Sequence, residues 1–532
     1  MSLFRSGSVV AAMTLVSRVL GFVRDQVLAV TFGAGGAVDV FLVAFKIPNF
    51  LRRLFGEGAF AQAFVPVFTE YRETRSPAAL RELAANVSGT FALVLLAVST
   101  IGVAAAPLLT WLFAPGFADE PERYELAVRM LRITFPYLLF VSLVAYAGSI
   151  LNAFGRFALP SFAPVLLNVS MIAAALAFAP RFDPPIVALA WGVFVAGVLQ
   201  LALQAPFLAR LGLLPRPRWG WRHPGVRRVL KLMVPALFGS SIAQINLLLD
   251  TIIASFLAAG SLSWLYFADR LMEFPLGLLG VTLGTIILPR LARVHARGAG
   301  PGAAEGAAVG AGATKGTDAE FRATLDWALR LALLTGLPAA LALALLAAPM
   351  LATLFGYGAF TAGDTAQAAV ALVAYAAGLP AFLLVKVLAP AFYARQDTRT
   401  PVRIGIAALV ANMGLNLAIV LPMLALDAPA PHAGLAAASS LSGWLQAWLL
   451  YRRLAADGTY RAGAAVRRTA LRVAPALGAF ALVATLGAGA DWHGAEAAAR
   501  VGRLVAILAA AGAAYASVLF LAGLRPRELA SP

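Results

Sequence analysis

The chain contains no cysteine and few charged residues. None of its 532 residues is Cys, and only 13% are Asp, Glu, Lys or Arg, against about 25% in soluble proteins. The missing cysteine excludes a disulfide framework and any thiolate metal site. The low charge, together with a hydrophobic share of 61%, excludes an ordinary soluble domain. We therefore interpret the chain as an all-α polytopic membrane protein.

Acidic residues are scarcer than basic ones. There are 25 Asp and Glu against 42 Lys and Arg, which gives a net charge of +17. In a soluble chain this balance would indicate a nucleic acid partner. Here the cations cluster in short segments between apolar runs, so membrane orientation and anionic lipid explain them better, and we predict no nucleic acid partner. The four His residues form no ligand cluster and no nucleotide-binding motif is present, so we predict no metal and no other cofactor.

Long apolar segments follow one another along the whole chain. A membrane-spanning helix needs about 20 apolar residues. The first segment is too long for a signal-peptide core and contains arginine, so we expect it to be retained. The second is interrupted by Pro48 and is interpreted as one broken helix. Fourteen predicted spans lie at 8–31, 37–70, 80–113, 123–153, 159–180, 184–209, 229–259, 262–290, 323–348, 364–394, 401–425, 432–452, 470–490 and 498–523.

The segments between the predicted spans alternate in charge. One set is rich in Arg, as in Arg210–Arg228, and the other contains acidic residues such as Asp119 and Glu120. By the positive-inside rule the basic set is cytoplasmic. An even number of spans then places both termini of this multi-pass protein in the cytoplasm. Gly298–Gly316, which is rich in Gly and Ala, is predicted to be a flexible cytoplasmic linker.

The two halves of the chain resemble each other. Asn152-Ala153 precedes Pro160 between the fourth and fifth spans, and Tyr393-Ala394 precedes Pro401 at the same spacing between the tenth and eleventh. This pattern predicts two pseudo-symmetric six-helix lobes and two additional C-terminal helices. We expect the N-terminal lobe at 1–225, the C-terminal lobe at 226–458 and the additional helices at 459–532.

The first predicted span carries two arginines. An Arg near the middle of a membrane helix costs about 2.5–3.5 kcal/mol on insertion scales, so Arg18 and Arg24 are expected to face a wet cavity. Arg18 and Asp25 are seven residues apart and share a helix face. Gly21 lies between the arginines and would allow the helix to bend there. The alternative is an ordinary helix end with arginines that reach toward the interface.

Two other spans also carry charge. The second contains Asp39, Lys46, Arg52, Arg53 and Glu57, and the eighth contains Asp269, Arg270 and Glu273. These charges come from both predicted lobes. They are interpreted either as ion pairs that hold the lobes together or as a cationic cavity, in which Arg forks would suit phosphate oxygens. We expect Asp39 and Glu57, near the span ends, to be solvated. Asp250 and Asp397 are either coupling-cation ligands or, more simply, carboxylates at helix ends.

Five segments resemble one known family. SRVLGFVRD (17–25), FKIPNFLRRLFGEGAFAQAFVP (45–66), LNAFGRFALPSFAPVLLN (151–168), SWLYFADRLMEFPLG (263–277) and VKVLAPAFYARQDTRTP (385–401) are similar to segments of the MurJ/MviN lipid II flippases. The resemblance covers about residues 1–455. It implies the multidrug/oligosaccharidyl-lipid/polysaccharide exporter fold, with two six-helix lobes in a V and two extra C-terminal helices that form a groove for a lipid tail.

The resemblance also implies an activity. The expected activity is transport, without catalysis, of undecaprenyl-pyrophosphate-linked peptidoglycan precursor from the cytoplasmic to the periplasmic leaflet by alternating access. The expected partners are lipid II, the bilayer and cell-wall synthesis proteins. The essential cavity arginines of that family correspond to Arg18, Arg24, Arg52 and Arg270. The supporting cavity residues are expected to be Ser17, Asp25, Asp39, Lys46, Asn49, Arg53, Glu57, Ser263, Asp269 and Glu273.

Two other functions are compatible with the residues. One is another exporter of the same superfamily, which would move polysaccharide lipids or drugs; a cation exporter should have a net acidic cavity, and the predicted cavity is basic. The other is a membrane-embedded glycosyl- or phosphotransferase, which would need a cluster of carboxylates or His on a loop. The sequence contains no such cluster.

Overall fold

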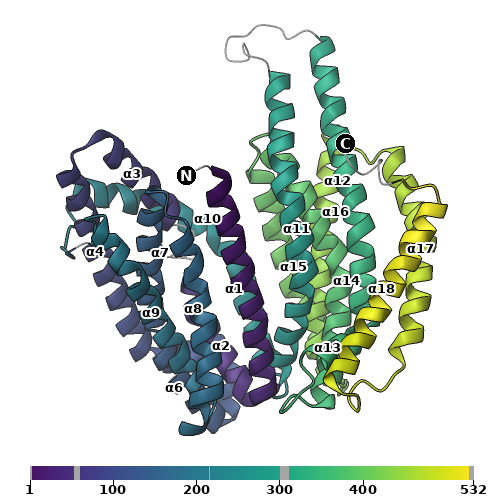
Figure 1. Cartoon of the computed structure of the whole chain (residues 1–532), viewed down its shortest axis with the longest axis horizontal. Helices are drawn as coiled ribbons and strands as arrows, with labels where there is room; N and C mark the ends of the chain where they lie inside the picture. Colours follow the sequence, from purple (N-terminus) through teal and green to yellow (C-terminus); the bar gives the residue numbers. More distant parts are fainter. Residues whose placement is uncertain (1–2, 53–59, 215, 300–310, 526–532) are drawn as a thin grey trace. The chain divides into compact units, whose positions relative to one another are not determined.

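The computed structural model describes residues 3–52, 60–214, 216–299 and 311–525. These residues form helices and turns, and no β-strand occurs among them (Figure 1). The chain separates into two compact units. Unit 1 comprises Met1–Ser263 and Tyr357–Phe360, and unit 2 comprises Trp264–Gly356 and Thr361–Pro532. The prediction of an all-α chain is confirmed for the described residues.

Unit 1 contains the first ten α-helices. Their bounds, with two short 3-10 helices (η2 and η4) and a π-helical turn (η3), are α1 Leu3–Phe32, α2 Gly36–Arg52, α3 Ala61–Thr74, α4 Pro77–Ala104, α5 Ala106–Phe113, η2 Pro115–Asp119, α6 Pro121–Thr134, α7 Tyr137–Ala153, α8 Ala158–Ala173, η3 Ala174–Phe178, η4 Ala179–Arg181, α9 Val187–Arg210 and α10 Pro224–Ser255.

Unit 2 contains the remaining helices, the first of which begins at the end of unit 1. Their bounds are α11 Ser261–Ala299, α12 Ala311–Leu345, α13 Ala347–Leu354, α14 Ala362–Tyr393, α15 Arg399–Ala425, α16 His432–Ala456, α17 Ala464–Ala488 and α18 Ala497–Leu521.

Many of these helices have the length and composition of membrane spans. Within the described ranges, nine helical stretches are long and apolar enough to cross a bilayer. They are Pro77–Ala104, Pro121–Ala153, Ala158–Arg181, Val187–Arg210, Ala319–Leu345, Ala362–Tyr393, Arg399–Ala425, Ala464–Ala488 and Ala497–Leu521. The prediction of a multi-pass membrane protein is confirmed.

Helix boundaries follow local sequence signals. Ser76 accepts a hydrogen bond from the backbone N–H of Ala79 and is followed by Pro77 in the first helical position of α4. At the start of α14, Thr361 and Asp364 exchange side-chain to backbone hydrogen bonds in a capping box. The second oxygen of Asp364 accepts a hydrogen bond from Trp264 Nε1 at 2.9 Å. The cap of α14 thus also holds the beginning of α11.

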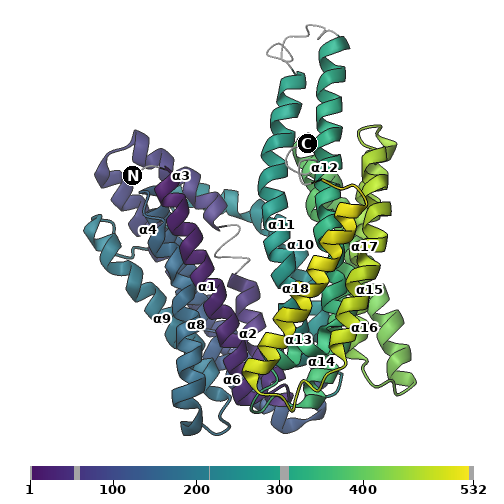
Figure 2. The ribbon, with the colours of Figure 1, turned by 45° about the vertical axis from the view of Figure 1, so that its right-hand side comes forward.

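The Gly- and Ala-rich segment is more helical than the sequence predicts. Residues 298–316 were expected to form a linker, but α11 continues to Ala299 and α12 begins at Ala311. The prediction is wrong at both ends, because alanine has the highest helix propensity and offsets the neighbouring glycines. Residues 300–310 lie outside the described residues. In Figures 1 and 2 these ends of α11 and α12 extend beyond the neighbouring helices of unit 2.

Aromatic packing fixes the helices of unit 1 to one another. The rings of Phe60 and Phe91 stack with their centroids 4.2 Å apart, and Phe64 contacts Tyr146 at 5.2 Å. The buried hydroxyl of Tyr146 donates to the carbonyl of Ala84 at 2.9 Å. These contacts join α3, α4 and α7. On the other side of the unit α1 lies along α8 (Figure 1).

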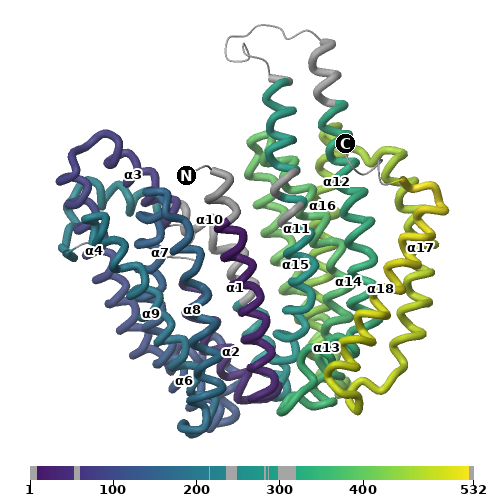
Figure 3. The backbone as a smooth tube through the Cα atoms, in the orientation of Figure 1, coloured from purple at the N-terminus to yellow at the C-terminus, as the bar shows by residue number. Residues whose placement is uncertain are grey.

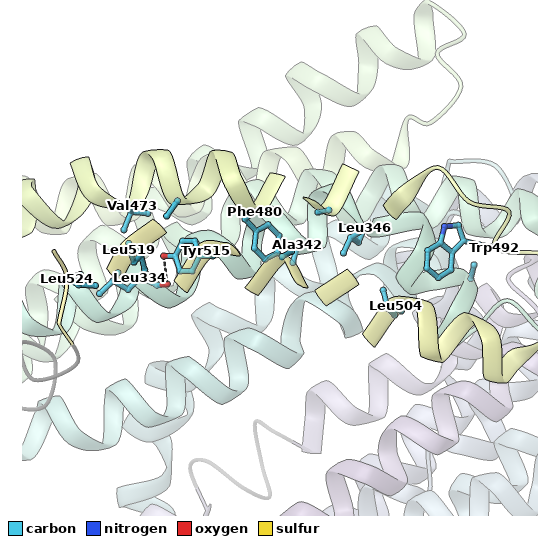
Figure 4. Close-up of a cluster of buried hydrophobic side chains, with 14 residues drawn as sticks. Leu334, Ala342, Leu346, Val473, Phe480, Trp492, Leu504, Tyr515, Leu519 and Leu524 are labelled. Atoms are coloured by element: carbon cyan, nitrogen blue, oxygen red, sulfur yellow. Dashed lines mark hydrogen bonds between the residues drawn. The ribbon is translucent and has the colours of Figure 1, made fainter. Parts of the chain in front are cut away.

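In unit 2 the last two helices pack as a pair against α12. Buried residues recur every three or four positions on α17, from Val473 to Ala484, and a matching stripe on α18 includes Tyr515 and Leu519. Figures 2 and 3 show α17 and α18 side by side, and Figure 4 shows their cluster with residues of α12. The Tyr515 hydroxyl donates to the carbonyl of Leu334 at 2.9 Å. The C-terminal pair is thus part of the core of unit 2.

Polar contacts fasten both ends of this pair. The buried guanidinium of Arg500, in the first turn of α18, donates to the carbonyl of Ala352 in the last turn of α13 at 3.1 Å and to that of Gly356, just after α13, at 2.8 Å. At the other end, the hydroxyl of the fully buried Tyr460 donates to Asp326 of α12 at 2.5 Å. The segment before α17 is therefore held to α12, and the beginning of α18 is held to the end of α13.

The repeat predicted from sequence has a local structural counterpart. After α7, Gly155 adopts a φ of 71° and the N–H of Arg156 donates to the carbonyl of Leu151. After α14, Gln396 adopts a φ of 60° and the N–H of Asp397 donates to the carbonyl of Phe392. Both helices therefore end in the same left-handed turn at equivalent positions.

Replacing Gln396 with glycine should stabilise the protein. The left-handed conformation costs a side-chain-bearing residue about 1 kcal/mol, and the equivalent position in the first half already has Gly155. We expect Q396G to raise the free energy of unfolding by up to about 1 kcal/mol and Gly155→Ala to lower it by a similar amount. Thermal unfolding of the purified variants checks both. A lower unfolding temperature for Q396G would contradict the equivalence of the two turns.

Candidate functional site

Arg24 is part of a polar network that joins α1 to α8. Its Nε and Nη2 donate to Asp25 Oδ1 at 3.0 and 2.7 Å, and its Nη1 donates to Asn168 Oδ1 at 3.1 Å. Asn168 donates in turn to the carbonyl of Ser17 at 3.1 Å. The side chain of Arg24 is 13% exposed and that of Asp25 is 5% exposed. The network therefore holds one guanidinium in a fixed orientation at the edge of the protein interior.

Gly21 lies inside α1, which is continuous through it. A Cβ built on Gly21 would lie 3.7 Å from the Asn168 side-chain nitrogen, at ordinary contact distance. Gly21 thus lies directly opposite the amide that positions Arg24.

Arg18 lies on the exposed face of the same helix. Its neighbours on this face are Leu15, Val19 and Phe22, which are 64%, 55% and 38% exposed. Arg18 has no hydrogen bond or ion pair to any other described residue, whereas Arg24, about two turns later, is oriented by its partners. The two arginines of the first span therefore differ in environment: Arg24 is held by its partners, and Arg18 lies on an exposed face of the helix.

The second predicted span contributes Lys46, Asn49 and Arg52. Lys46 Nζ donates to the hydroxyl of Thr251 on α10 at 3.2 Å. Arg52 Nε donates to Asn49 Oδ1 at 2.7 Å, one turn earlier on α2. All three side chains are half-buried. Arg53 and Glu57, which were predicted to be supporting residues, lie outside the described residues.

Asp39 accepts hydrogen bonds from the beginning of α11. Its Oδ1 accepts from the backbone N–H and hydroxyl of Ser263, at 2.8 and 2.5 Å, and its Oδ2 accepts from the N–H of Gly260 at 2.7 Å. The Nη2 of Arg123 donates to the same Oδ2 at 3.0 Å. Because a helix N-terminus has unpaired N–H groups and a partial positive charge, a carboxylate is the natural cap there.

The prediction that Asp39 is solvated is wrong. The residue has 0% exposure, and the Arg123 side chain that pairs with it is 6% exposed. The Cζ atom of Arg123 also lies 4.1 Å from the centre of the Phe117 ring. The position of Asp39 near a span end suggested contact with water, but the beginnings of α2, α6 and α11 enclose the pair.

Arg270 belongs to unit 2, on α11. Its Nη1 donates to Glu273 Oε2 at 2.8 Å, and its Cζ lies 4.8 Å from the centre of the Tyr266 ring. The two charged side chains are 37% and 52% exposed, so solvent screens their attraction. Asp269 beside them is half-buried. Arg270 is therefore held over an aromatic ring while part of its guanidinium remains accessible.

Asp397 has the structural role of a helix-end carboxylate. Its Oδ1 accepts a hydrogen bond from the N–H of Thr400 at 3.0 Å, at the beginning of α15. Hydrogen bonds from Thr400, first from its side chain and then from its backbone, lower the pKa of Asp397. The stabilisation that the ionised Asp397 gives the turn is present at neutral pH and is lost as the pH falls through the lowered pKa.

The structure assembles part of the predicted residue set and adds members to it. It brings Arg24, Asp25 and the backbone of Ser17 together, and it joins Asp39 to Ser263. It adds Asn168 and Arg123, which the sequence prediction missed. Asn168 could have been recognised as a lone amide in an apolar span, whereas Arg123, in an acidic loop, resembles a surface residue.

The comparison with known proteins decides the family. The family model described as "Lipid II flippase MurJ" matches residues 28–498. The chain belongs to the MurJ family. A "Probable lipid II flippase MurJ" of Haemophilus influenzae is 47% identical over 97% of this chain and 99% of its own length. A relative of the same description in Vibrio cholerae is 46% identical, over 99% of this chain and 97% of its own length.

Solved structures agree with this assignment at the level of the fold. The structure "Lipid II flippase MurJ, inward closed conformation" matches with a TM-score of 0.76 at 24% identity, covering 97% of this chain and 99% of that one. An inward-facing multidrug resistance MATE family transporter matches with a TM-score of 0.62 at 14% identity, over 83% of this chain and 95% of that one. The chain thus has the fold of these two solved structures, as the family resemblance implies.

Proposed function

We propose that this chain is a lipid II flippase. It moves undecaprenyl-pyrophosphate-linked peptidoglycan precursor from the cytoplasmic to the periplasmic leaflet of the bacterial inner membrane, for cell-wall synthesis. The observation that carries the proposal is membership of the MurJ family over residues 28–498, together with relatives of that description that match nearly from end to end. The fold likeness to a MATE transporter supports the architecture, and no observation favours drugs or polysaccharide lipids as the cargo.

The proposed topology has fourteen spans with both termini in the cytoplasm. Two six-helix lobes, 1–225 and 226–458, are followed by the two helices of 459–532. The charge alternation of the connecting segments supports this orientation. Accessibility of single cysteines to an impermeant reagent tests it readily, because the chain has no cysteine of its own. A cysteine at position 222 should be labelled only from the cytoplasmic side, and one at position 119 only from the other side.

The proposed mechanism is alternating access with the arginines on the pyrophosphate. Arg18, Arg24, Arg52 and Arg270 receive the phosphate oxygens, since guanidinium forks match them in two-point contacts. They offset the free-energy cost of removing a charged headgroup from water, while the polyprenyl chain stays in lipid. The supporting observations are the fixed guanidinium of Arg24 and the accessible guanidinium of Arg270.

The last two helices, α17 and α18, are proposed to bind the polyprenyl tail of the lipid. Their buried stripe packs against α12, and on α17 Leu482 and Leu486 are 63% and 79% exposed. On α18, Val501 and Val505 are 49% and 59% exposed. These side chains form apolar surface on the helix pair. Such surface suits a polyprenyl chain.

Alanine substitution of the four arginines tests the proposal. Each loss of a charge-assisted contact should lower translocation of lipid II by roughly 10- to 100-fold, since such bonds contribute about 1.5–3 kcal/mol. The measurement is lipid II translocation at matched protein abundance. If all four variants translocate lipid II at the normal rate, the assignment of the arginines to the pyrophosphate is wrong. Covalent change of lipid II on incubation with the pure protein would instead indicate an enzyme.

A further inference from the structure

The segment that joins α9 to α10 carries charge of one sign only. Between Ala205 and Leu249 the sequence contains seven Lys and Arg and no Asp or Glu. Arg228 pairs with Glu70 of α3 at 2.8 Å. Arg216, Arg218 and Arg222 are exposed, and their guanidinium groups have no hydrogen bond or ion pair to any described residue. Arg216, Arg218 and Arg222, together with the exposed Arg227 and Lys231 at the beginning of α10, are called the cationic patch below.

The backbone of this segment is fixed to α4. The N–H of Arg218 donates to the carbonyl of Ala85, and the N–H of Gly220 donates to the hydroxyl of Thr90, each at 3.1 Å. The approach is close: a Cβ on Gly89 would lie 2.2 Å from the carbonyl oxygen of Arg218. The cationic patch is thus held at one place on the side of α4.

Two tryptophans project beside the cations. Trp219 and Trp221 are 59% and 47% exposed, and their rings stack with centroids 5.9 Å apart and an interplanar angle of 13°. Tryptophan is enriched where a membrane protein meets the headgroup level of the bilayer. A stacked and exposed pair next to unpaired arginines indicates a surface that faces lipid headgroups.

An apolar cleft begins directly below the patch. It is lined by eleven residues from Phe60, α4 and α10, of which only Thr90 is polar. Thr90 is also the residue that holds Gly220. Along α4 the cleft runs from Val87 to Val98, which is about 16 Å of helix. It opens to the surface at Val94, which is 40% exposed.

We propose that the cationic patch, the tryptophan pair and this cleft form a binding site for an anionic phospholipid of the surrounding bilayer. The lipid phosphate lies against Arg218 and Arg222, and one acyl chain enters the α4–α10 cleft. The charge favours an anionic headgroup over a zwitterionic one. The exposed apolar side chain of Leu232, next to the cleft residue Met233 on α10, favours a bilayer lipid over a soluble anion.

Lipid binding to the purified full-length protein tests this proposal. Native mass spectrometry would compare phosphatidylglycerol with phosphatidylcholine, and we expect the wild-type protein to retain phosphatidylglycerol preferentially. R218Q/R222Q should bind phosphatidylglycerol about 25-fold more weakly, at about fivefold for each cation lost near a membrane surface. The control R399Q/R403Q removes two exposed cations from the beginning of α15, a basic segment that has no tryptophan, and it should retain wild-type affinity.

A second pair of variants examines the acyl chain. V98F fills the cleft and should weaken phosphatidylglycerol binding, whereas L96F, on the exposed face of the same helix, should not. Equal affinity for the two phospholipids, or equal losses in the two arginine double variants, would overturn the proposal. So would displacement of phosphatidylglycerol by lipid II combined with loss of lipid II binding in V98F, because the cleft would then belong to the transported substrate. Thermal unfolding at the wild-type temperature verifies that each variant is folded.

Discussion

Replacing Asp39 with alanine is expected to lower the free energy of unfolding by about 3–5 kcal/mol, the cost of leaving one member of a buried ion pair alone. Arg123 would remain buried without its carboxylate, and the N–H groups of Gly260 and Ser263 would lose their acceptor. Because Asp39 joins α2 to the beginning of α11, we also expect D39A to abolish transport. Thermal unfolding and lipid II translocation measure the two effects.

Arg123 also contacts a second carboxylate, which offers a matched control. Glu120 contacts Arg123 at 3.4 Å, but its side chain is 60% exposed, so Glu120→Gln should cost less than about 1 kcal/mol. The double variant D39A/R123L should recover part of the lost stability, because it removes the unpaired charge while the uncapped α11 remains. If D39A is no less stable than E120Q, the buried pair does not have the role assigned to it.

Replacing Arg24 with alanine should lower lipid II translocation on the order of 100-fold at equal abundance, the upper range for a charge-assisted contact. Arg24→Lys should lose most of this activity as well, because an ammonium group cannot make the two-point contact of a guanidinium. Arg75→Ala, which removes an exposed cation of the same unit, is the control and should be near wild type.

Asn168→Ala separates substrate binding from structural support. It removes the contacts from Asn168 to Arg24 and to the Ser17 carbonyl and leaves the pair of Arg24 with Asp25. We expect N168A to reduce translocation by roughly 10-fold, the effect of about 1.4 kcal/mol, and to lower stability slightly. If N168A and R24A are equally inactive at equal abundance, Arg24 acts only by joining α1 to α8.

Much of the fold can be predicted from the sequence, because the length and periodicity of the apolar segments are local properties of the chain. Every predicted span overlaps at least one described helix, and the long segments at 80–113 and 123–153 are each divided near a proline, Pro107 and Pro136. The equivalence of the Gly155 and Gln396 turns was likewise anticipated by the matching motifs before them. The extension of α11 and α12 was missed because glycine content was given more weight than alanine propensity.

The candidate site was less predictable, because its partners are distant along the chain. Asp39 is 84 residues from Arg123 and 221 from Gly260, and no local pattern reports such a pairing. The position of Asp39 near a span end suggested contact with solvent, whereas its burial depends on the beginnings of three helices that meet. Arg24 and Asp25 were identified because a charged pair inside an apolar span is a local signal, but their orientation depends on Asn168, 144 residues away from Arg24.

The most direct test of the proposed function is the leaflet distribution of lipid II after rapid depletion of this protein, in cells where it is the only member of its family. The proposed function predicts that lipid II accumulates in the cytoplasmic leaflet as soon as the protein is lost, before growth stops, and that R24A fails to restore its appearance in the outer leaflet. Lipid II that continues to reach the outer leaflet at the normal rate without the protein would contradict the proposal.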